Sequence, residues 1–329
     1  DTLNGMGGID TIFGGSGNDL ITTGAGTGDV ALGGTGTDTL IGNFDGDLLI
    51  GGSVTGTAVT DQSDVEADWV NFASSGSGVI LDLSTTVTAG SGIYAGNYYS
   101  KAISTANSSS YDYVRQVENI TGSDYADTLT GTSGDNSILS GNGNDVIILT
   151  AGANDYYDGG AGSDWVSFQS MGTTATNFDF YNNSAKKTAG SATVVNIENV
   201  IGYNGVQNTT GYGDSSNNTF VMYDGADVIG GYQGDDVYDL GAGNDVALAA
   251  YGNDTIIGGS GWDRLDYYNW WGSNQGTTII LTNQDLNGDG DTLDANESTT
   301  VVSVSVQGLS TLAHGTYNFF KITEGRSGY

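Results

Sequence analysis

A nine-residue period constrains this chain more than any other feature of its sequence. From Gly231 to Asp266 the chain reads GYQGDDVYD, LGAGNDVAL, AAYGNDTII and GGSGWDRLD, with an aspartate at the sixth position of every unit. The full pattern, Gly-Gly-x-Gly-x-Asp-x-U-x with U apolar, also occurs at 14–22, 33–41 and 159–167. A chain with this period must alternate tight turns with very short extended segments.

The period predicts a coiled β fold. Glycine reaches positive φ without a steric clash, so the first six residues of a unit can turn tightly, and x-U-x then forms a three-residue strand with U on one side. Two units make one flattened coil, and coils stack at the β-sheet spacing of about 4.8 Å. We predict an all-β fold, a parallel β-roll or β-solenoid that three β-rich excursions interrupt.

Stacked turns of this kind predict calcium sites. Aspartate carboxylates and turn carbonyls would form an all-oxygen cage, which suits Ca²⁺ with its roughly six to eight oxygen ligands. Softer metals prefer Cys or His, and the chain has no Cys and one His. Solvated aspartate turns are the alternative, but the shared phase of consecutive units favours calcium, with about ten ions in all. The predicted repeat ligands are Asp1, Asp10, Asp19, Asp29, Asp38, Asp47, Asp127, Asn136, Asp145, Asp155, Asp164, Asp227, Asp236, Asp245, Asp254 and Asp263.

Alternate units should share one edge of the roll. The first block then carries two columns, Asp1 with Asp19 and Asp38, and Asp10 with Asp29 and Asp47. Asn136 keeps a carbonyl oxygen at its ligand position but lacks the charge, so we expect a weaker site there.

A second type of calcium site is predicted near the C-terminal end. The segment Asp285-Leu-Asn287-Gly-Asp289-Gly-Asp291 matches the opening of an EF-hand loop, in which spaced oxygens surround one ion and a glycine permits the bend. The twelfth residue is Asn296 in place of the usual glutamate, and Glu297 follows it. A solvated acidic loop is the alternative.

Charge makes folding dependent on counter-ions. The 329 residues include 39 acidic and 7 basic side chains, for a formal charge of −32. A chain so charged should stay disordered until cations bind, and it should not bind nucleic acid. The sequence also shows no proline, no signal peptide and no apolar run long enough for a transmembrane helix.

The blocks and excursions predict three modules. We place them at 1–121, 122–201 and 202–329 within one continuous solenoid. Asp68-Trp-Val-Asn-Phe matches Asp164-Trp-Val-Ser-Phe, and Val117-Glu-Asn-Ile matches Ile197-Glu-Asn-Val, so the excursions begin and end alike. Residues 202–221 fit the period least, with Gln207 where an aspartate is expected.

The repeat blocks, somewhat under half of the chain, resemble the RTX or haemolysin-type calcium-binding family of Gram-negative bacteria. The resemblance implies type I secretion of an unfolded chain that folds in extracellular calcium. The family's C-terminal secretion signal is not visible here. Members of the family include toxins, proteases, lipases, adhesins and surface-layer proteins, so the repeat predicts a scaffold and not an activity.

Other special residues point away from catalysis. His314 has no nucleophile motif beside it, and Glu118 and Glu198 occupy equivalent repeated positions, which favours a structural role. Aromatic residues could form a glycan-binding platform or pack the excursions, and we favour packing. They are Trp69, Trp165, Trp262, Trp270, Trp271, Tyr98, Tyr99, Tyr156, Tyr157, Tyr267 and Tyr268.

We therefore expect a secreted, non-enzymatic structural protein at the bacterial cell surface, such as an adhesin segment or a surface-layer or filament subunit. The alternatives are a noncatalytic module of a secreted exoenzyme and a carbohydrate-binding adhesin domain. The closing Gly325-Arg-Ser-Gly-Tyr329 and the opening Asp1-Thr-Leu-Asn would join into one complete nonapeptide. We accordingly expect self-association, as a head-to-tail array or lattice that calcium supports.

Overall fold

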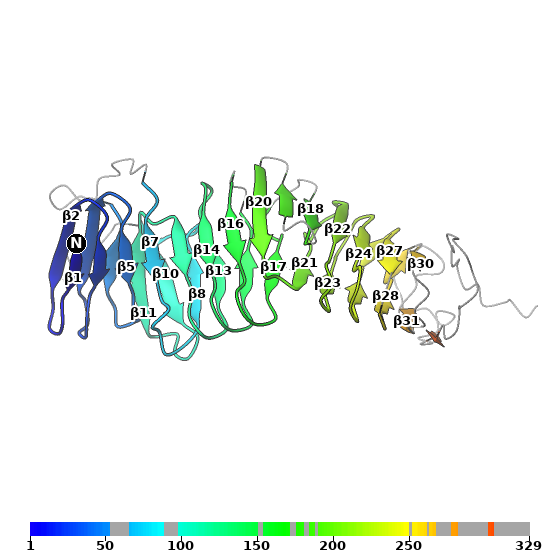
Figure 1. The fold of residues 1–329 in the computed structure, drawn as a ribbon, viewed down its shortest axis with the longest axis horizontal. Helices are drawn as coiled ribbons and strands as arrows, with labels where there is room; N and C mark the ends of the chain where they lie inside the picture. The colour runs from blue at the N-terminus through cyan, green and yellow to red at the C-terminus, as the bar shows by residue number, and fades with distance from the viewer. Residues whose placement is uncertain are drawn as a thin grey trace, which may run out of the picture. The chain divides into compact units, whose positions relative to one another are not determined.

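The described part of the chain is built from β-strands. The computed structural model describes residues 1–52, 66–88, 98–150, 154–171, 176–180, 184–187, 190–249, 252–261, 263–267, 278–281 and 302–305. Every regular element in these ranges is a short strand (Figure 1). Within them there is no helix of the length and apolarity that crossing a membrane requires.

The chain forms two compact units. The first comprises residues 1–166 and 189–197, and the second comprises 167–188 and 198–329. Each unit contains strands of two long, mainly parallel sheets, which confirms the predicted roll. The finer division into three modules stays a prediction.

One sheet of the first unit is wholly parallel, because each strand pairs with the strand one coil further on. Its order is β1 (Thr2–Asn4), β3 (Leu20–Thr22), β5 (Thr39–Ile41), β7 (Trp69–Asn71), β12 (Asn119–Thr121), β14 (Ser137–Leu139), β16 (Tyr156–Asp158) and β20 (Gly190–Val195).

The other sheet of the first unit includes one strand that runs against its neighbours. Its order is β2 (Thr11–Ser16), β4 (Val30–Thr35), β6 (Leu48–Ile50), β11 (Tyr111–Arg115), β10 (Tyr98–Ser104), β8 (Val79–Asp82), β13 (Thr128–Thr130), β15 (Val146–Ile148) and β17 (Trp165–Ser167). Strand β10 is antiparallel to β11 and β8, and β9 (Val87–Thr88) pairs with its start. The first excursion thus contributes strands to both sheets.

The second unit repeats this scheme. One sheet has the order β19 (Ser184–Lys187), β18 (Thr176–Asp179), β22 (Thr209–Tyr212), β24 (Val228–Gly230), β27 (Val246–Ala249) and β30 (Arg264–Tyr267). The other has β21 (Asn199–Ile201), β23 (Thr219–Val221), β25 (Val237–Asp239), β28 (Thr255–Ile257), β31 (Thr278–Leu281) and β32 (Val302–Ser305). A small pair joins β26 (Ala242–Gly243) to β29 (Ser260–Gly261). Strands β18 and β31 each pair with an antiparallel strand from an excursion.

The stretch with the weakest period remains in the roll. Residues 202–221 supply β22 and β23, which pair in parallel with β24 and β25. The position in register with Asp227 is occupied by Thr209, whose N–H donates to the Asp227 carboxylate at 2.6 Å. The sequence-based placement at Gln207 was therefore two residues too early.

The core is a row of single apolar residues. In most three-residue strands the middle residue, position U of the repeat, is buried, as at Ile21, Leu40, Ile138 and Ile147, each 0% exposed. Burying one such side chain stabilises a fold by about 1.5–3 kcal/mol. A regular coil adds two, so its apolar core is small. Strands β4 and β6 bury additional residues, Val30, Leu32, Leu48 and Ile50, which pack with Tyr99.

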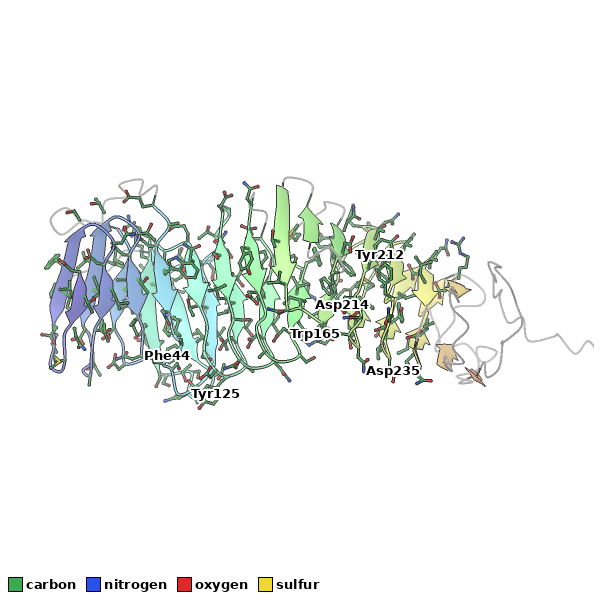
Figure 2. The ribbon with its side chains drawn as sticks, in the orientation of Figure 1. Phe44, Tyr125, Trp165, Tyr212, Asp214 and Asp235 are labelled. Atoms are coloured by element: carbon green, nitrogen blue, oxygen red, sulfur yellow. The ribbon has the colours of Figure 1, made fainter. Side chains whose placement is uncertain are left out.

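Several of the conspicuous aromatic residues belong to this core. Tyr99 and Tyr157 are fully buried, and Trp69 is half-buried. Trp165, labelled in Figure 2, is also half-buried. Tyr156 is the more open one, at 38% exposure. The structure does not describe four other aromatic residues of this set, Trp262, Tyr268, Trp270 and Trp271, or the side chains of Tyr98 and Tyr267.

Candidate metal centre

Most repeats place an aspartate, here called a ladder aspartate, immediately before a strand, and the fold buries most of these side chains. Asp29, Asp38, Asp145 and Asp245 are 0% exposed. Neighbouring turn residues behave differently: Asp235, labelled in Figure 2, is exposed, although it directly precedes a buried ladder aspartate. A buried carboxylate is strongly unfavourable unless hydrogen bonds or cations compensate its charge. The ladder aspartates therefore need partners.

One carboxylate oxygen of most ladder aspartates has such a partner. The backbone N–H of Asp10 donates to Asp29 Oδ1 at 2.7 Å, and that of Asp29 donates to Asp47 Oδ1 at 2.9 Å. The donor and acceptor are 18 or 19 residues apart, which is one coil. The same bond joins Asp19 to Asp38, Asp127 to Asp145, Asp145 to Asp164, Asn136 to Asp155, Asp227 to Asp245, Asp245 to Asp263, Asn218 to Asp236 and Asp236 to Asp254. The Asp1 nitrogen lies 2.5 Å from Asp19 Oδ1.

The second carboxylate oxygen lacks a hydrogen-bond donor at many of these positions. Within the described ranges, Oδ2 is buried without a hydrogen bond in Asp10, Asp19, Asp29, Asp47, Asp145, Asp245, Asp254 and Asp263. A buried acceptor left unsatisfied costs about 1–3 kcal/mol, and more when it is charged. Two parallel columns of such oxygens per unit need an external source of positive charge.

The first glycine of the motif makes room for this carboxylate. A Cβ atom on Gly14 would lie 2.6 Å from Asp19 Oδ2, and one on Gly258 would lie 2.5 Å from Asp263 Oδ2. Real Cβ atoms do not approach so closely, so any other residue would displace the carboxylate. The aspartate at the sixth position of the nonapeptide therefore requires a glycine at the first position.

Comparison with known protein families identifies these repeated turns. A family model described as the RTX calcium-binding nonapeptide repeat (4 copies) matches residues 1–30, 121–154, 148–166, 212–247 and 249–268. The repeat blocks belong to the RTX family. No curated protein matches the chain. The ladder runs beyond the matched residues, because Asp38 and Asp47, which lie outside them, continue the same bonds.

The ligand set of the RTX turns fits calcium. Every ladder position offers oxygen, and the unsatisfied ladder oxygens are buried carboxylate atoms beside the first glycine of the turn, as at Asp19 and Asp263. Calcium accepts six to eight such oxygens at about 2.3–2.6 Å in flexible geometry, whereas Mg²⁺ needs a near-ideal octahedron. RTX repeats imply calcium binding, and they are typical of secreted proteins. The number of ions stays a prediction.

Burial and nearby negative charges raise the pKa of several ladder aspartates. Burial, with added repulsion from Asp263 and Asp227, raises the pKa of Asp245 to about 8. Burial likewise raises the pKa of Asp236 to about 7 and that of Asp47 to about 7. Without a cation, these carboxylates hold protons near neutral pH, so calcium must displace them.

We predict that the metal-free protein is more folded in mild acid than in mild base. The folded-state pKa values of about 6 to 8 exceed the ordinary value of 3.8, so the folded chain retains protons that the unfolded chain releases. Stability without calcium is then fully present below about pH 4 and is lost as pH rises towards 8. Far-UV circular dichroism of chelator-treated protein at pH 5 and pH 8 measures this. A larger β signal at pH 8 would contradict the assignment.

Three ladder residues come from outside the nonapeptides, and the predicted ligand set omitted them. The N–H of Asp38 donates to Asp68 Oδ1 at 2.7 Å, and that of Asp68 donates to Glu118 Oε2 at 3.1 Å. In the other column, Asp47 N–H donates to Asp112 Oδ1 at 3.0 Å. Two repeated motifs in the sequence could have indicated Asp68 and Glu118 as ladder residues: the match of Asp68 to Asp164, and the repeated Glu-Asn motif that contains Glu118. Asp112 has no such motif.

The side-chain amide of Asn136 forms hydrogen bonds to the carbonyls of its own turn, which a carboxylate cannot do. Its side-chain Nδ2 donates to the carbonyls of Thr132, at 3.2 Å, and Gly134, and approaches Asp155 Oδ1 at 3.3 Å. These bonds occupy carbonyl oxygens that a cation would otherwise coordinate. Weaker calcium binding at this turn remains our prediction, with a hydrogen-bonded amide as its physical cause.

Replacing this amide by a carboxylate is expected to create a full site. Asn136→Asp removes the three Nδ2 bonds and adds the missing charge, so the number of calcium ions bound per chain should rise by one. Native mass spectrometry in calcium measures the change. Asn107→Asp adds the same charge at an exposed turn and should leave the number unchanged. An equal ion count in wild type and Asn136→Asp would contradict the prediction.

The EF-hand-like prediction lies outside the described part of the chain. The structure does not describe the predicted ligands Asp285, Asn287, Asp289 and Asp291, nor the closing residues Asn296 and Glu297. It does not describe His314 either. The second type of calcium site remains an expectation from the sequence.

Proposed function

We propose that this chain is a calcium-dependent structural segment of a secreted cell-surface protein, and that extracellular calcium drives its RTX blocks to fold. The observation that supports this most is the column of buried Oδ2 atoms without donors, as at Asp10, Asp29 and Asp245. A folded state that leaves so many charged oxygens unsatisfied requires the cations that the RTX pattern implies.

The overall charge supports the same proposal. A formal charge of −32 opposes any compact state. About ten calcium ions, at two charges each, would cancel roughly 20 of these charges and would act where the carboxylates are closest. Ion binding would then supply much of the folding free energy, as it does in small metal-stabilised domains.

We infer a structural role and not a catalytic one from the way the carboxylates are used. The ladder oxygens face backbone amides and turn interiors, and not an open cleft, as Asp227 and Asp245 illustrate. The burial of Tyr99 and Tyr157 removes two large aromatic side chains from a possible glycan platform, which favours a scaffold over a lectin-like domain.

Self-association is part of this proposal, because the end coils of a parallel roll expose backbone groups that another roll can pair with. Two measurements test the role. Antibody labelling of intact producing cells should detect the protein at the surface, and chelator treatment should release or unfold it. Electron microscopy of purified protein should show assemblies in calcium. Protein confined to the cytosol, or a monomer at every concentration in calcium, would contradict the respective part.

A further inference from the structure

The turn at residues 42–47 departs from the repeat pattern. It reads Gly-Asn-Phe-Asp-Gly-Asp, so Asp45 stands at the fourth position, where the preceding turn of the sequence has Gly36 at φ 119°. Here Phe44, at φ 65°, and Gly46, at φ 98°, adopt the left-handed region instead. This conformation is uncommon for a bulky residue. The altered backbone places a second acidic side chain beside Asp47.

A third carboxylate reaches this turn from an inserted strand. Asp112, at the start of β11 and 0% exposed, belongs to no nonapeptide. Its Oδ2 accepts the N–H groups of Asn43 and Phe44 at 3.0 and 2.9 Å. Its Oδ1 accepts those of Gly46 and Asp47 at 3.2 and 3.0 Å. Four backbone amides therefore fix the Asp112 carboxylate against the turn.

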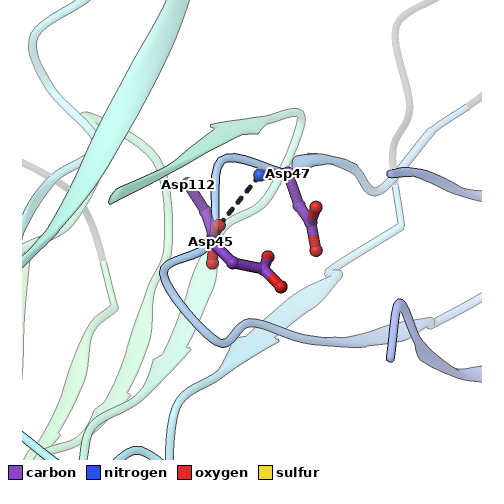
Figure 3. A group of neighbouring side chains, drawn as sticks. All are labelled: Asp45, Asp47 and Asp112. Carbon is purple, nitrogen blue, oxygen red and sulfur yellow. Dashed lines mark hydrogen bonds between the residues drawn. The ribbon is translucent and has the colours of Figure 1, made fainter. Parts of the chain in front are cut away.

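The three carboxylates lie within the span of one coordination sphere. One oxygen from each of Asp45, Asp47 and Asp112 lies within 4.8 Å of the others, and Figure 3 shows the Asp45 and Asp47 carboxylates facing each other beside Asp112. Two oxygens bound to the same calcium ion at about 2.3–2.6 Å are at most about 5 Å apart. The spacing therefore fits a shared ion.

Unsatisfied buried oxygens point into the cluster. Asp47 is 0% exposed, and its Oδ2 has no hydrogen bond; neither does the buried Oδ1 of half-buried Asp45. Asp45 Oδ2 is used, since it accepts Gly26 N–H at 3.2 Å and Asn43 Nδ2 at 2.9 Å. In the part of the chain that the structure describes, no lysine or arginine forms an ion pair with the three carboxylates. Asp45 and Asp47 thus each keep an oxygen available for a cation, and Asp112 adds a third negative charge beside them.

We propose that Asp45, Asp47 and Asp112 hold a calcium ion that fastens the inserted strands β10 and β11 to the first repeat block. The inference rests on the calcium binding proposed for the RTX turns, but it concerns a site in which one ligand lies 65 residues from the turn that it completes. The ion would make the docking of these strands calcium-dependent. Water and turn carbonyls can supply the remaining ligands.

Charge-neutralising variants of the full chain test the site. Asp45→Asn retains an oxygen for the Gly26 and Asn43 bonds, and Asp112→Asn retains one of the two oxygens that receive the amides. Native mass spectrometry in calcium should show one ion fewer for each variant, or a Kd for that ion at least tenfold higher. Asp124→Asn, at an exposed turn position of the same unit, removes the same charge and should lose nothing.

Hydrogen exchange at limiting calcium provides a second measurement. Amides of β10 and β11 should exchange faster in Asp45→Asn than in wild type, while those of β25 and β28 in the other unit should not change. Because Asp112→Asn also disturbs four amide bonds, Asp45→Asn decides the question. If wild type binds calcium but Asp45→Asn binds as many ions with equal β11 protection, this inference is overturned alone. If wild type binds no calcium, the proposed function fails with it.

Discussion

In calcium-free buffer at pH 7.5 the chain is expected to give the far-UV circular dichroism of an unfolded polypeptide, and added calcium should restore the β signal. A site filled at one hundred times its Kd stabilises the folded state by about 2.7 kcal/mol. About five such sites would match the roughly 5–15 kcal/mol by which whole domains are stable. Two buried apolar residues stabilise a regular coil by about 3–6 kcal/mol. Ordering the backbone of its 18 residues costs about 1–2 kcal/mol per residue, so the core alone cannot replace the calcium contribution.

Two controls separate specific binding from screening of charge. Magnesium at equal concentration should restore much less signal, because it loses its water reluctantly and needs a tighter octahedron. Sodium chloride at equal ionic strength screens repulsion without coordinating the buried oxygens, so it should restore little. A β spectrum that persists in excess chelator would overturn the calcium dependence proposed here.

The second large effect is expected from Asp245→Ala. Its Oδ1 accepts the Asp227 N–H at 2.7 Å, and its own N–H donates to Asp263 Oδ1 at 3.1 Å, so one residue links three coils. Alanine leaves the buried Asp227 N–H without an acceptor, which costs about 1–3 kcal/mol of stability. It also removes a calcium ligand. In saturating calcium the melting temperature should fall by roughly 10 °C, and a several-fold higher calcium concentration should be needed for folding.

Matched variants assign the cause of that loss. Asp245→Asn keeps an oxygen for the Asp227 amide but lacks the charge, so it should retain part of the stability while still requiring more calcium. Asp224→Ala removes an exposed aspartate of the same unit and should behave as wild type. Because neighbouring coils stabilise each other, exchange protection should decrease on both sides of Asp245. An unchanged calcium midpoint in Asp245→Ala would show that this ladder position binds no ion.

The sequence was sufficient to predict the roll and its two columns because the information is local. A nine-residue unit fixes both the turn and the strand, so a phase error at Asp29 or Asp38 would be visible in the sequence itself. The buried middle residue of each strand, such as Leu40, followed from the same pattern. Counting back by nines from Asp227 gives Asn218 and Thr209, which the structure places in register, so the assignment to Gln207 did not follow the period.

The residues that close the columns could not be predicted in the same way. Asp112 meets Asp47 across 65 residues, because β11 pairs in parallel with β6 and so places Asp112 opposite Asp47. No period connects such positions in the sequence. The amide of Asn136 is a different case, since its identity predicted a lost charge but not the carbonyl bonds that it makes instead.

The one-coil spacing of the ladder has a mechanical consequence. A coil of 18 residues, such as that from Asp227 to Asp245, adds about 5 Å to the stack but spans about 60 Å when pulled straight. The hydrogen bonds between coils run along the stacking direction, so tension along it would open one coil at a time. Each opening would lengthen the chain roughly twelvefold for that segment, and the bound cation would set the force required. A tether of this kind yields gradually and shortens again once the load is removed.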